Sequence, residues 1–158
     1  MNKWNKLASK ETVNKTIKSL KENGIEAKLV ETSEDAKKEI LFLIPEGAEV
    51  MTMTSVTLDT IDIPKELNGS GKYDSVKNKL NSMDRATQGL EMQKLGAAPE
   101  YAVGSIHAVT EDGHVLIASN SGSQIPAYVY GSTHVIWVVG AQKIVKNIDE
   151  GIKRIYEY

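Results

Sequence analysis

The stretch that decides the fold runs from Tyr101 to Val145 and reads YAVGSIHAVTEDGHVLIASNSGSQIPAYVYGSTHVIWVVGAQKIV. Its apolar and β-branched residues predict three strands, at 102–109, 115–118 and 134–139. Glu111-Asp112-Gly113 predicts a tight turn between the first two strands, because Asp and Gly tolerate positive φ at low cost. The stretch therefore predicts a sheet whose polar loops lie directly beside buried strands.

Three polar loops follow these strands. Each is directly preceded by a strand candidate: Thr110-Glu111, Ser119 to Gln124, and Gly140 to Lys143. A short helix over 125–130 is predicted after the second loop, with Pro126 in its first turn, where no N–H is needed. Strands that are apolar on both faces belong to sheets covered by helices on both sides, and ligands of such sheets bind beyond the carboxyl ends of the strands.

The sequence after this stretch predicts a well-formed helix. Asn147 is a suitable N-cap, with Glu150 three residues later as its capping-box partner. An i, i+4, i+7 stripe is expected to pack inward: Ile148, Ile152 and Ile155. Lys153 and Arg154 suit the negative end of the helix dipole.

The sequence before the stretch alternates predicted helices and strands. A first helix is expected to begin at Ser9 or Thr12 and to end at Asn23, and a second, capped by Ser33, is expected to end before Pro45. Further helices are expected around 56–61, over 73–83 and over 85–95. Strands are expected at 25–30 and 50–53. Ile63-Pro64 is expected to end a segment, and residues 68–71 to be flexible. Residues 69–99 lack a good strand, so we expect them to cover the sheet or to form a subunit interface, as in a homodimer. The alternation predicts one α/β domain over 1–158, three-layered and Rossmann-like with a mostly parallel sheet.

The composition excludes several classes of function. The net charge is −2, so the chain has no electrostatic footprint for nucleic acid or an anionic membrane. It has no cysteine, which excludes disulfides, a thiolate nucleophile and any iron–sulfur cluster held by this chain's thiolates. The first ten residues lack the apolar segment of a signal peptide, and no apolar run is long enough to span a membrane, so we expect a cytoplasmic protein.

Candidate site residues lie in the loops that follow strands. Thr54-Ser55 follows the strand at 50–53 and precedes a helix, so it is expected to bind an anion, to cap that helix, or both. Ser121, Gly122, Ser123 and Gln124 offer hydroxyl, amide and backbone donors, which suit a phosphate or carboxylate, or else a capped polar connection. We expect these two segments to line one shared pocket, with Lys143 as the nearest cation, although Lys143 also fits a surface role.

The acid–base candidates are few. Glu111 is a candidate general base or carboxylate nucleophile, or an acidic residue of a hairpin turn, and His107 is the second candidate. Three histidines without metal-ligand spacing indicate no metal site. No motif indicates a cofactor.

The stretch also resembles a known family. It is similar to the carboxyl-terminal part of the lactate-utilisation (LUD) domain at 104–113 (GSIHAVTEDG), 121–124 (SGSQ) and 138–145 (VVGAQKIV), with a weaker match at 47–63. Together these segments cover about two thirds of the chain. The LUD family resembles the fold group of ribose-phosphate isomerases, glucosamine-phosphate deaminases and CoA transferases, which implies a CoA transferase-like fold.

Two branches of that fold group carry catalytic carboxylates in short motifs. CoA transferases carry a glutamate in a Ser-Glu-Asn-Gly motif, and Thr110-Glu111-Asp112-Gly113 is similar to it. Methylthioribose-phosphate isomerases carry a catalytic aspartate in a Gly-Ala-Asp segment, whereas Gly104-Ser105-Ile106 has no carboxylate. The second comparison argues against isomerase chemistry of that type.

The resemblance implies two functions. The chain is expected to bind a small anionic metabolite, namely a hydroxy or keto acid, a sugar phosphate or a CoA ester. Alternatively, it is a non-catalytic accessory subunit of a lactate-oxidation complex whose partner subunits carry iron–sulfur clusters.

Overall fold

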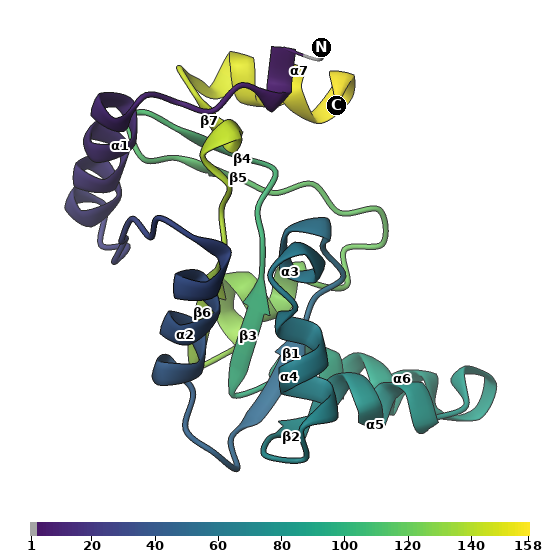
Figure 1. Cartoon of the computed structure of the whole chain (residues 1–158). Coiled ribbons are helices and arrows are strands. Elements are labelled where there is room, and N and C mark those ends of the chain that lie inside the picture. Colours follow the sequence, from purple (N-terminus) through teal and green to yellow (C-terminus); the bar gives the residue numbers. More distant parts are fainter. Residues whose placement is uncertain (1–2) are drawn as a thin grey trace. The chain divides into compact units, whose positions relative to one another are not determined.

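The structure is a computed structural model that describes residues 3–158. The chain forms two compact units, each with its own sheet (Figure 1). The central unit comprises Thr32–Ser105 and Ser119–Val138. The terminal unit comprises the described residues up to Glu31, together with Ile106–Ala118 and Val139–Tyr158. The expectation of a single domain over 1–158 stays a prediction.

A four-stranded parallel sheet forms the core of the central unit. Its strands lie in the order β2 (Asp74–Ser75), β1 (Glu49–Thr52), β3 (Tyr101–Gly104) and β6 (His134–Trp137). All four residues of β3 are buried, as expected for a strand in the middle of a sheet covered on both faces. The predicted α/β class with a mostly parallel sheet is confirmed, and the arrangement is consistent with a Rossmann-like three-layer domain.

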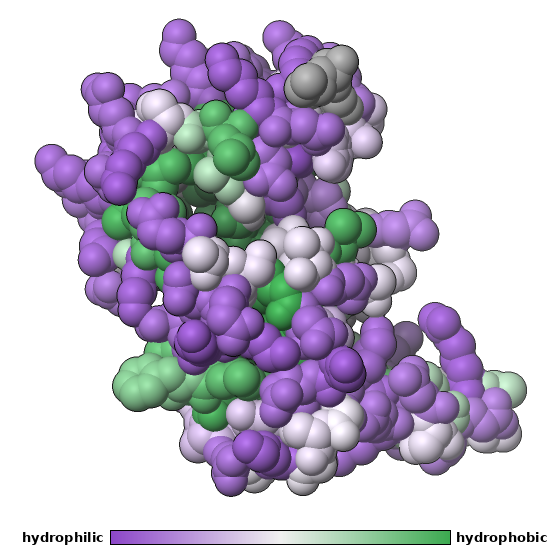
Figure 2. Space-filling model, in the orientation of Figure 1, coloured by the Kyte–Doolittle hydropathy of each residue, from purple (hydrophilic) through white to green (hydrophobic). Residues whose placement is uncertain are grey.

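The helices of the central unit surround this sheet. They are α2 (Ser33–Leu43), α3 (Val56–Thr60), α4 (Ile63–Gly69), α5 (Val76–Ser82), α6 (Arg85–Ala97) and the π-helix η2 (Ala127–Gly131). Both α4 and α5 pack on β1. The surface over α5 and α6 is mainly hydrophilic (Figure 2), which agrees with the absence of buried residues in α6.

Several predictions for the central unit were wrong in detail. Ile63-Pro64 starts α4 rather than ending a segment, because Pro fits the first turn of a helix. Asn68, expected to be flexible, lies in α4, and its side-chain amide bonds Thr52 and Ser75. β2 adds a short strand between 69 and 99, where none was expected. Thr32, not Ser33, caps α2 by accepting from the backbone N–H of Asp35.

A three-stranded sheet forms the terminal unit. It contains β5 (Val115–Leu116), β4 (Ala108–Thr110) and β7 (Ile144–Val145), with β4 antiparallel to β5 and parallel to β7. The helical elements of this unit are η1 (Lys3–Asn5), α1 (Lys10–Glu22), η3 (Ala141–Lys143) and α7 (Ile148–Glu157). The predicted hairpin turn is confirmed, and Gly113 adopts φ +87° in it.

The predicted strand at 102–109 is divided between the two sheets. β3 ends at Gly104 and β4 begins at Ala108, so each part pairs with different partners. The predicted strand at 25–30 is absent, since the chain there forms no ladder. The N–H of Ile25 instead donates to the carbonyl of Leu20 and closes the end of α1, with Gly24 at φ +80°.

The cap of α7 is as predicted and the cap of α1 is one of the two predicted candidates, but the orientation of α7 is not as predicted. Ser9 caps α1, and Asn147 caps α7 by accepting from the N–H of Glu150 at 3.0 Å. The stripe predicted to be buried is largely open, with Ile148 and Ile152 each 45% exposed. The buried residues of α7 are Gly151 and Arg154. A Cβ at Gly151 would lie 2.7 Å from the side chain of Leu116, so this glycine allows close approach of α7 to β5.

Candidate functional site

The short segment before β4 anchors two cationic side chains in the terminal unit. The carbonyl of Ile106 accepts a hydrogen bond from Lys143 Nζ at 2.8 Å. The carbonyl of the next residue, His107, accepts one from Arg154 Nη1 at 2.6 Å. Lys143 comes from η3 and Arg154 from α7, so three separate parts of the sequence meet here. We call His107, Lys143 and Arg154 the basic cluster.

Arg154 is the most unusual member of the basic cluster. Only 3% of it is exposed, and its Nε and Nη2 atoms are buried without a hydrogen-bond partner among the described residues. The ring of Tyr158 lies 4.5 Å from its Cζ atom and covers one face of the guanidinium. Burial lowers the pKa of Arg154, although an arginine remains protonated in a protein. Two N–H donors of a buried cation are therefore left unused.

Lys143 and His107 share the electrostatic environment of Arg154. Burial, followed by the positive charge of Arg154, lowers the pKa of Lys143 to about 8. Burial, then the charges of Lys143 and Arg154, lowers the pKa of His107 below its ordinary value, so its ring is neutral at pH 7. His107 Nδ1 lies 3.2 Å from the N–H of Ala118 and accepts from it, which places the ring proton on Nε2. The basic cluster is thus rich in donors and in positive charge.

Glu111 lies in the same unit but has a different partner. Its carboxylate forms an ion pair with Lys15 of α1 at 2.7 Å, and its N–H donates to the carbonyl of Val145. The hydrogen bond to Glu111 is the main reason that the pKa of Lys15 is raised. Glu111 was the first acid–base candidate and His107 the second, and the described hydrogen bonds and ion pairs do not join them. A catalytic role for Glu111 stays a prediction.

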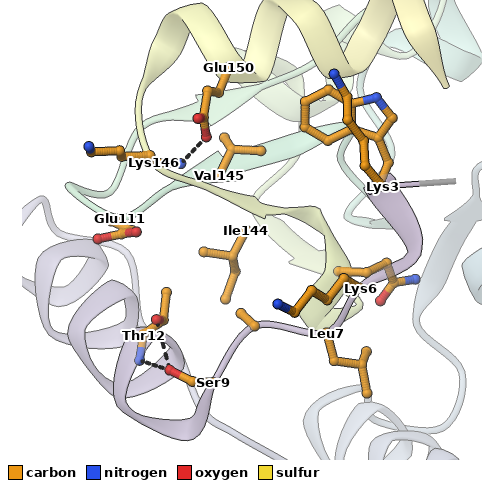
Figure 3. A pocket seen from close by; sticks show the side chains of 13 residues that line it. Lys3, Lys6, Leu7, Ser9, Thr12, Glu111, Ile144, Val145, Lys146 and Glu150 are labelled. Atoms are coloured by element: carbon orange, nitrogen blue, oxygen red, sulfur yellow. Dashed lines mark hydrogen bonds between the residues drawn. The ribbon is translucent and has the colours of Figure 1, made fainter.

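A pocket of about 690 Å³ opens beside Glu111 in the terminal unit (Figure 3). Its walls come from η1 and the segment leading to α1, the turn after β4, the residues around β7 and the start of α7. Its lining includes three lysines and two glutamates, and Glu150 accepts a hydrogen bond from the N–H of Lys146 at 3.0 Å. His107, Lys143 and Arg154 do not line this pocket.

The predicted binding loop at 119–124 belongs to the central unit, and its polar groups bond one another. Ser119 Oγ accepts from the N–H of Gly122 at 2.9 Å and donates to Gln124 Oε1 at 3.3 Å. Ser121 Oγ donates to Ser123 Oγ at 3.0 Å. Gly122 has φ +73°, and a Cβ there would meet nothing within 4 Å. Gly122 therefore serves the turn of the backbone.

Thr54 and Ser55 also lie in the central unit, directly after β1. Ser55 stands at the N-cap of α3 without a side-chain capping bond, so the predicted capping bond is wrong. Thr54 Oγ1 accepts a hydrogen bond from Lys77 Nζ at 3.2 Å. No described hydrogen bond joins Thr54 or Ser55 to the loop at 119–124, and their shared pocket stays a prediction.

Arg154 was missed as a site residue, although the sequence holds a signal for it. Gly151 is an unfavourable residue inside a helix, and a helix tolerates it where that face must approach a neighbour closely. Arg154 follows three residues later and so lies on the same face. His107 and Lys143 were both predicted, the first as an acid–base group and the second as a ligand-binding cation.

The fold and the cluster define a class: an α/β domain with a mostly parallel sheet and a donor-rich cationic site on a second, smaller sheet. A family model described as LUD domain matches residues 13–158. The chain therefore belongs to the LUD domain family, which supports a role related to lactate utilisation. Searches of the curated proteins and of the solved structures found no match.

Within residues 3–158, no helix has both the length and the apolar composition needed to cross a bilayer. The same residues contain no group of three or more His, Cys, Asp or Glu side chains placed to hold a metal ion.

Proposed function

We propose that this LUD domain binds a small organic acid, a hydroxy or keto acid, through the basic cluster. The observation that carries this proposal is the pair of unused donors on Arg154, Nε and Nη2. These two N–H groups point in parallel from one edge of the planar guanidinium, and this fork matches the two oxygens of a carboxylate.

The charge of the cluster supports an anionic ligand. Arg154 forms no ion pair with a carboxylate in the described part of the chain. Its positive charge, together with burial, lowers the pKa of Lys143. A buried cation without a counter-ion is costly, and a bound anion offsets that cost. The ring of His107 is neutral, so it adds no positive charge that a bound anion would have to share, and its proton lies on Nε2.

Access requires a local movement, because Nε and Nη2 have no exposed surface. Tyr158 is the side chain that covers the guanidinium, and it is 64% exposed. Its ring contributes only a cation–π contact, worth about 0.5–1 kcal/mol at an exposed site. Displacing it costs less than a charge-assisted bidentate hydrogen bond contributes, so movement of the ring gives access, and the acid then binds in the plane of the guanidinium, at the edge that carries Nε and Nη2.

A thermal-shift screen tests the proposal. The ligand panel is lactate, pyruvate, ribose 5-phosphate and acetyl-CoA, compared on wild type, Arg154→Met and a matched control, Lys153→Met. Lys153 is the exposed neighbour on the same helix, so its substitution removes the same charge without touching the cluster. A ligand at 100 times its dissociation constant stabilises the folded state by about 2.7 kcal/mol. We expect lactate or pyruvate to raise the melting temperature of wild type and Lys153→Met but not of Arg154→Met.

Two results contradict the proposal. One is an equal shift in Arg154→Met and wild type, which would place the ligand elsewhere. The other is no shift with any ligand, which would favour an accessory role in a lactate-oxidation complex.

The half-exposed Ile148 and Ile152 on α7 are the observation that favours this second function, since they offer apolar surface to a partner subunit. A chain without cysteine would leave all iron–sulfur ligation to that partner.

A further inference from the structure

The amine of Lys143 is held in place. The residue ends the 3-10 turn η3, whose backbone closes by a hydrogen bond from the N–H of Lys143 to the carbonyl of Gly140 at 2.9 Å. Its Nζ is fixed by the carbonyl of Ile106 at 2.8 Å. Lys143 is only partly exposed, so its side chain is partly withdrawn from water. This fixed amine differs from a flexible lysine on the surface.

The surroundings of Lys143 favour a neutral amine. The carbonyls of two consecutive residues hold Lys143 and Arg154, which brings two positive charges into one small region. Burial and then Arg154 lower the pKa of Lys143 to about 8. At pH 7 this leaves roughly one amine in ten unprotonated, against fewer than about one in a thousand for an ordinary lysine. A lysine beside another cation in a partly desolvated site is a recognised form of activated nucleophile.

We infer that Lys143 forms a Schiff base with the ketone carbon of a small α-keto acid whose carboxylate is bound by Arg154. This inference rests on the proposed function, because it needs the carboxylate site, and it adds a covalent step and a substrate class. In an α-keto acid the ketone carbon is bonded directly to the carboxylate carbon. A carboxylate on Arg154 therefore holds the ketone within the same basic cluster as the amine of Lys143.

The step balances without any oxidant or reductant. The lone pair of the neutral Nζ adds to the ketone carbon, and the π electrons of the C=O bond move to oxygen. One N–H proton passes to that oxygen to form a carbinolamine. The second N–H proton leaves with the hydroxyl group as water, and a C=N bond remains. A hydroxy acid such as lactate binds the same arginine but has no ketone, so it cannot take part.

The test is reductive trapping of the full chain with pyruvate and sodium cyanoborohydride, read by intact mass and by peptide mapping. Lactate with the same reductant is the ligand control. Lys143→Arg keeps the charge but cannot form a C=N bond with pyruvate in this way, and Lys146→Arg is the matched control at an exposed lysine nearby. We expect one adduct per chain at Lys143 in wild type and in Lys146→Arg, and its loss in Lys143→Arg. Arg154→Lys should lower its yield several-fold.

The Schiff base at Lys143 and carboxylate binding at Arg154 can fail independently of each other. If pyruvate raises the melting temperature through Arg154 but no adduct forms at Lys143, the Schiff base is refuted and carboxylate binding stands. Adducts spread evenly over surface lysines also refute it. If neither a thermal shift nor an adduct appears in a chain that unfolds cooperatively, both ideas fail. Lys143→Met, compared by thermal unfolding with Lys143→Arg, shows whether loss of the adduct reflects loss of the fold.

Discussion

Replacing Arg154 by methionine tests whether this arginine is kept for binding rather than for stability. Methionine fills similar volume and has no charge. The change removes two buried N–H groups that lack partners, each costing about 1–3 kcal/mol in the wild-type protein. It also removes the repulsion between Arg154 and Lys143 that contributes to the lowered pKa of the lysine.

The same substitution loses favourable contacts. The hydrogen bond from Nη1 to the His107 carbonyl is charge-assisted and contributes about 1.5–3 kcal/mol. The cation–π contact with Tyr158 adds about 0.5–1 kcal/mol. Gains of about 2–6 kcal/mol and losses of about 2–4 kcal/mol nearly cancel. We therefore expect the free energy of unfolding of Arg154→Met to lie within about 2 kcal/mol of wild type, on the stable side.

Urea denaturation at pH 7 without ligand measures this difference, with Lys153→Met as the surface control expected within about 0.5 kcal/mol of wild type. If the buried N–H groups carried no cost, only the favourable contacts would be lost, and the free energy of unfolding would fall by about 2–4 kcal/mol. That outcome would mean that Arg154 is a structural residue and would remove the main support for an organic-acid site.

Three further predictions concern other positions. Folding lowers the pKa of Lys143 from 10.5 to about 8, so the unfolded chain binds more protons than the folded chain between pH 8 and pH 10.5. The free energy of unfolding of wild type, measured in urea titrations relative to Lys143→Met, should therefore rise by about 1 kcal/mol over this pH range. A difference that does not change with pH would contradict this. Gly104→Ala should lower the free energy of unfolding by about 1–3 kcal/mol, because the new Cβ would clash with the Tyr128 hydroxyl. Gly89→Ala, which has open space around it, should not destabilise the fold. Equal effects of the two substitutions would refute the clash. Ile152→Ala should cost about 1 kcal/mol or less by denaturation, since 45% of Ile152 is exposed, and a loss above about 2 kcal/mol would show that the helix face is covered in solution.

Local sequence signals predicted the parts of the fold that depend on local chemistry. Asn147 was identified as a cap, and Ser9 as one of two candidate caps, because a side-chain oxygen next to a helix start satisfies a free N–H regardless of what lies further away. The turn at 111–113 was likewise predictable, since Asp and Gly determine it. The parallel pairing of β1, β3 and β6 followed from the alternation of strands and helices.

The division of the 102–109 segment was not predictable from its composition. All four residues of β3 and all three of β4 are buried, so the apolar pattern is the same on both sides of Ser105. What separates them is the choice of partners, since β3 pairs with β1 and β6 while β4 pairs with β5 and β7. Such long-range pairing is a tertiary property that a single sequence pattern does not contain.

The orientation of α7 was mispredicted because hydrophobicity and packing distance point to different faces of this helix. Three isoleucines give a strong apolar stripe, yet Gly151 is the residue that lets the helix approach β5. Arg154 follows Gly151 onto the buried face, where it reaches the His107 carbonyl. Sequence reasoning placed Arg154 at the helix end as a partner of the dipole, which is the ordinary role of such a residue.

The two units differ in whether their candidate donors already have hydrogen-bond partners. In the central unit, the hydroxyl and amide groups of the loop at 119–124 already bond one another, so a ligand there would first have to break those hydrogen bonds. In the terminal unit, Arg154 has two donors that nothing in residues 3–158 accepts, and it stands with Lys143 beside a neutral histidine. A ligand gains most where donors are dehydrated and unused, because it restores their hydrogen bonds at little cost to existing ones. The basic cluster meets that condition within one compact unit, and binding measurements should therefore begin with Arg154 and Lys143.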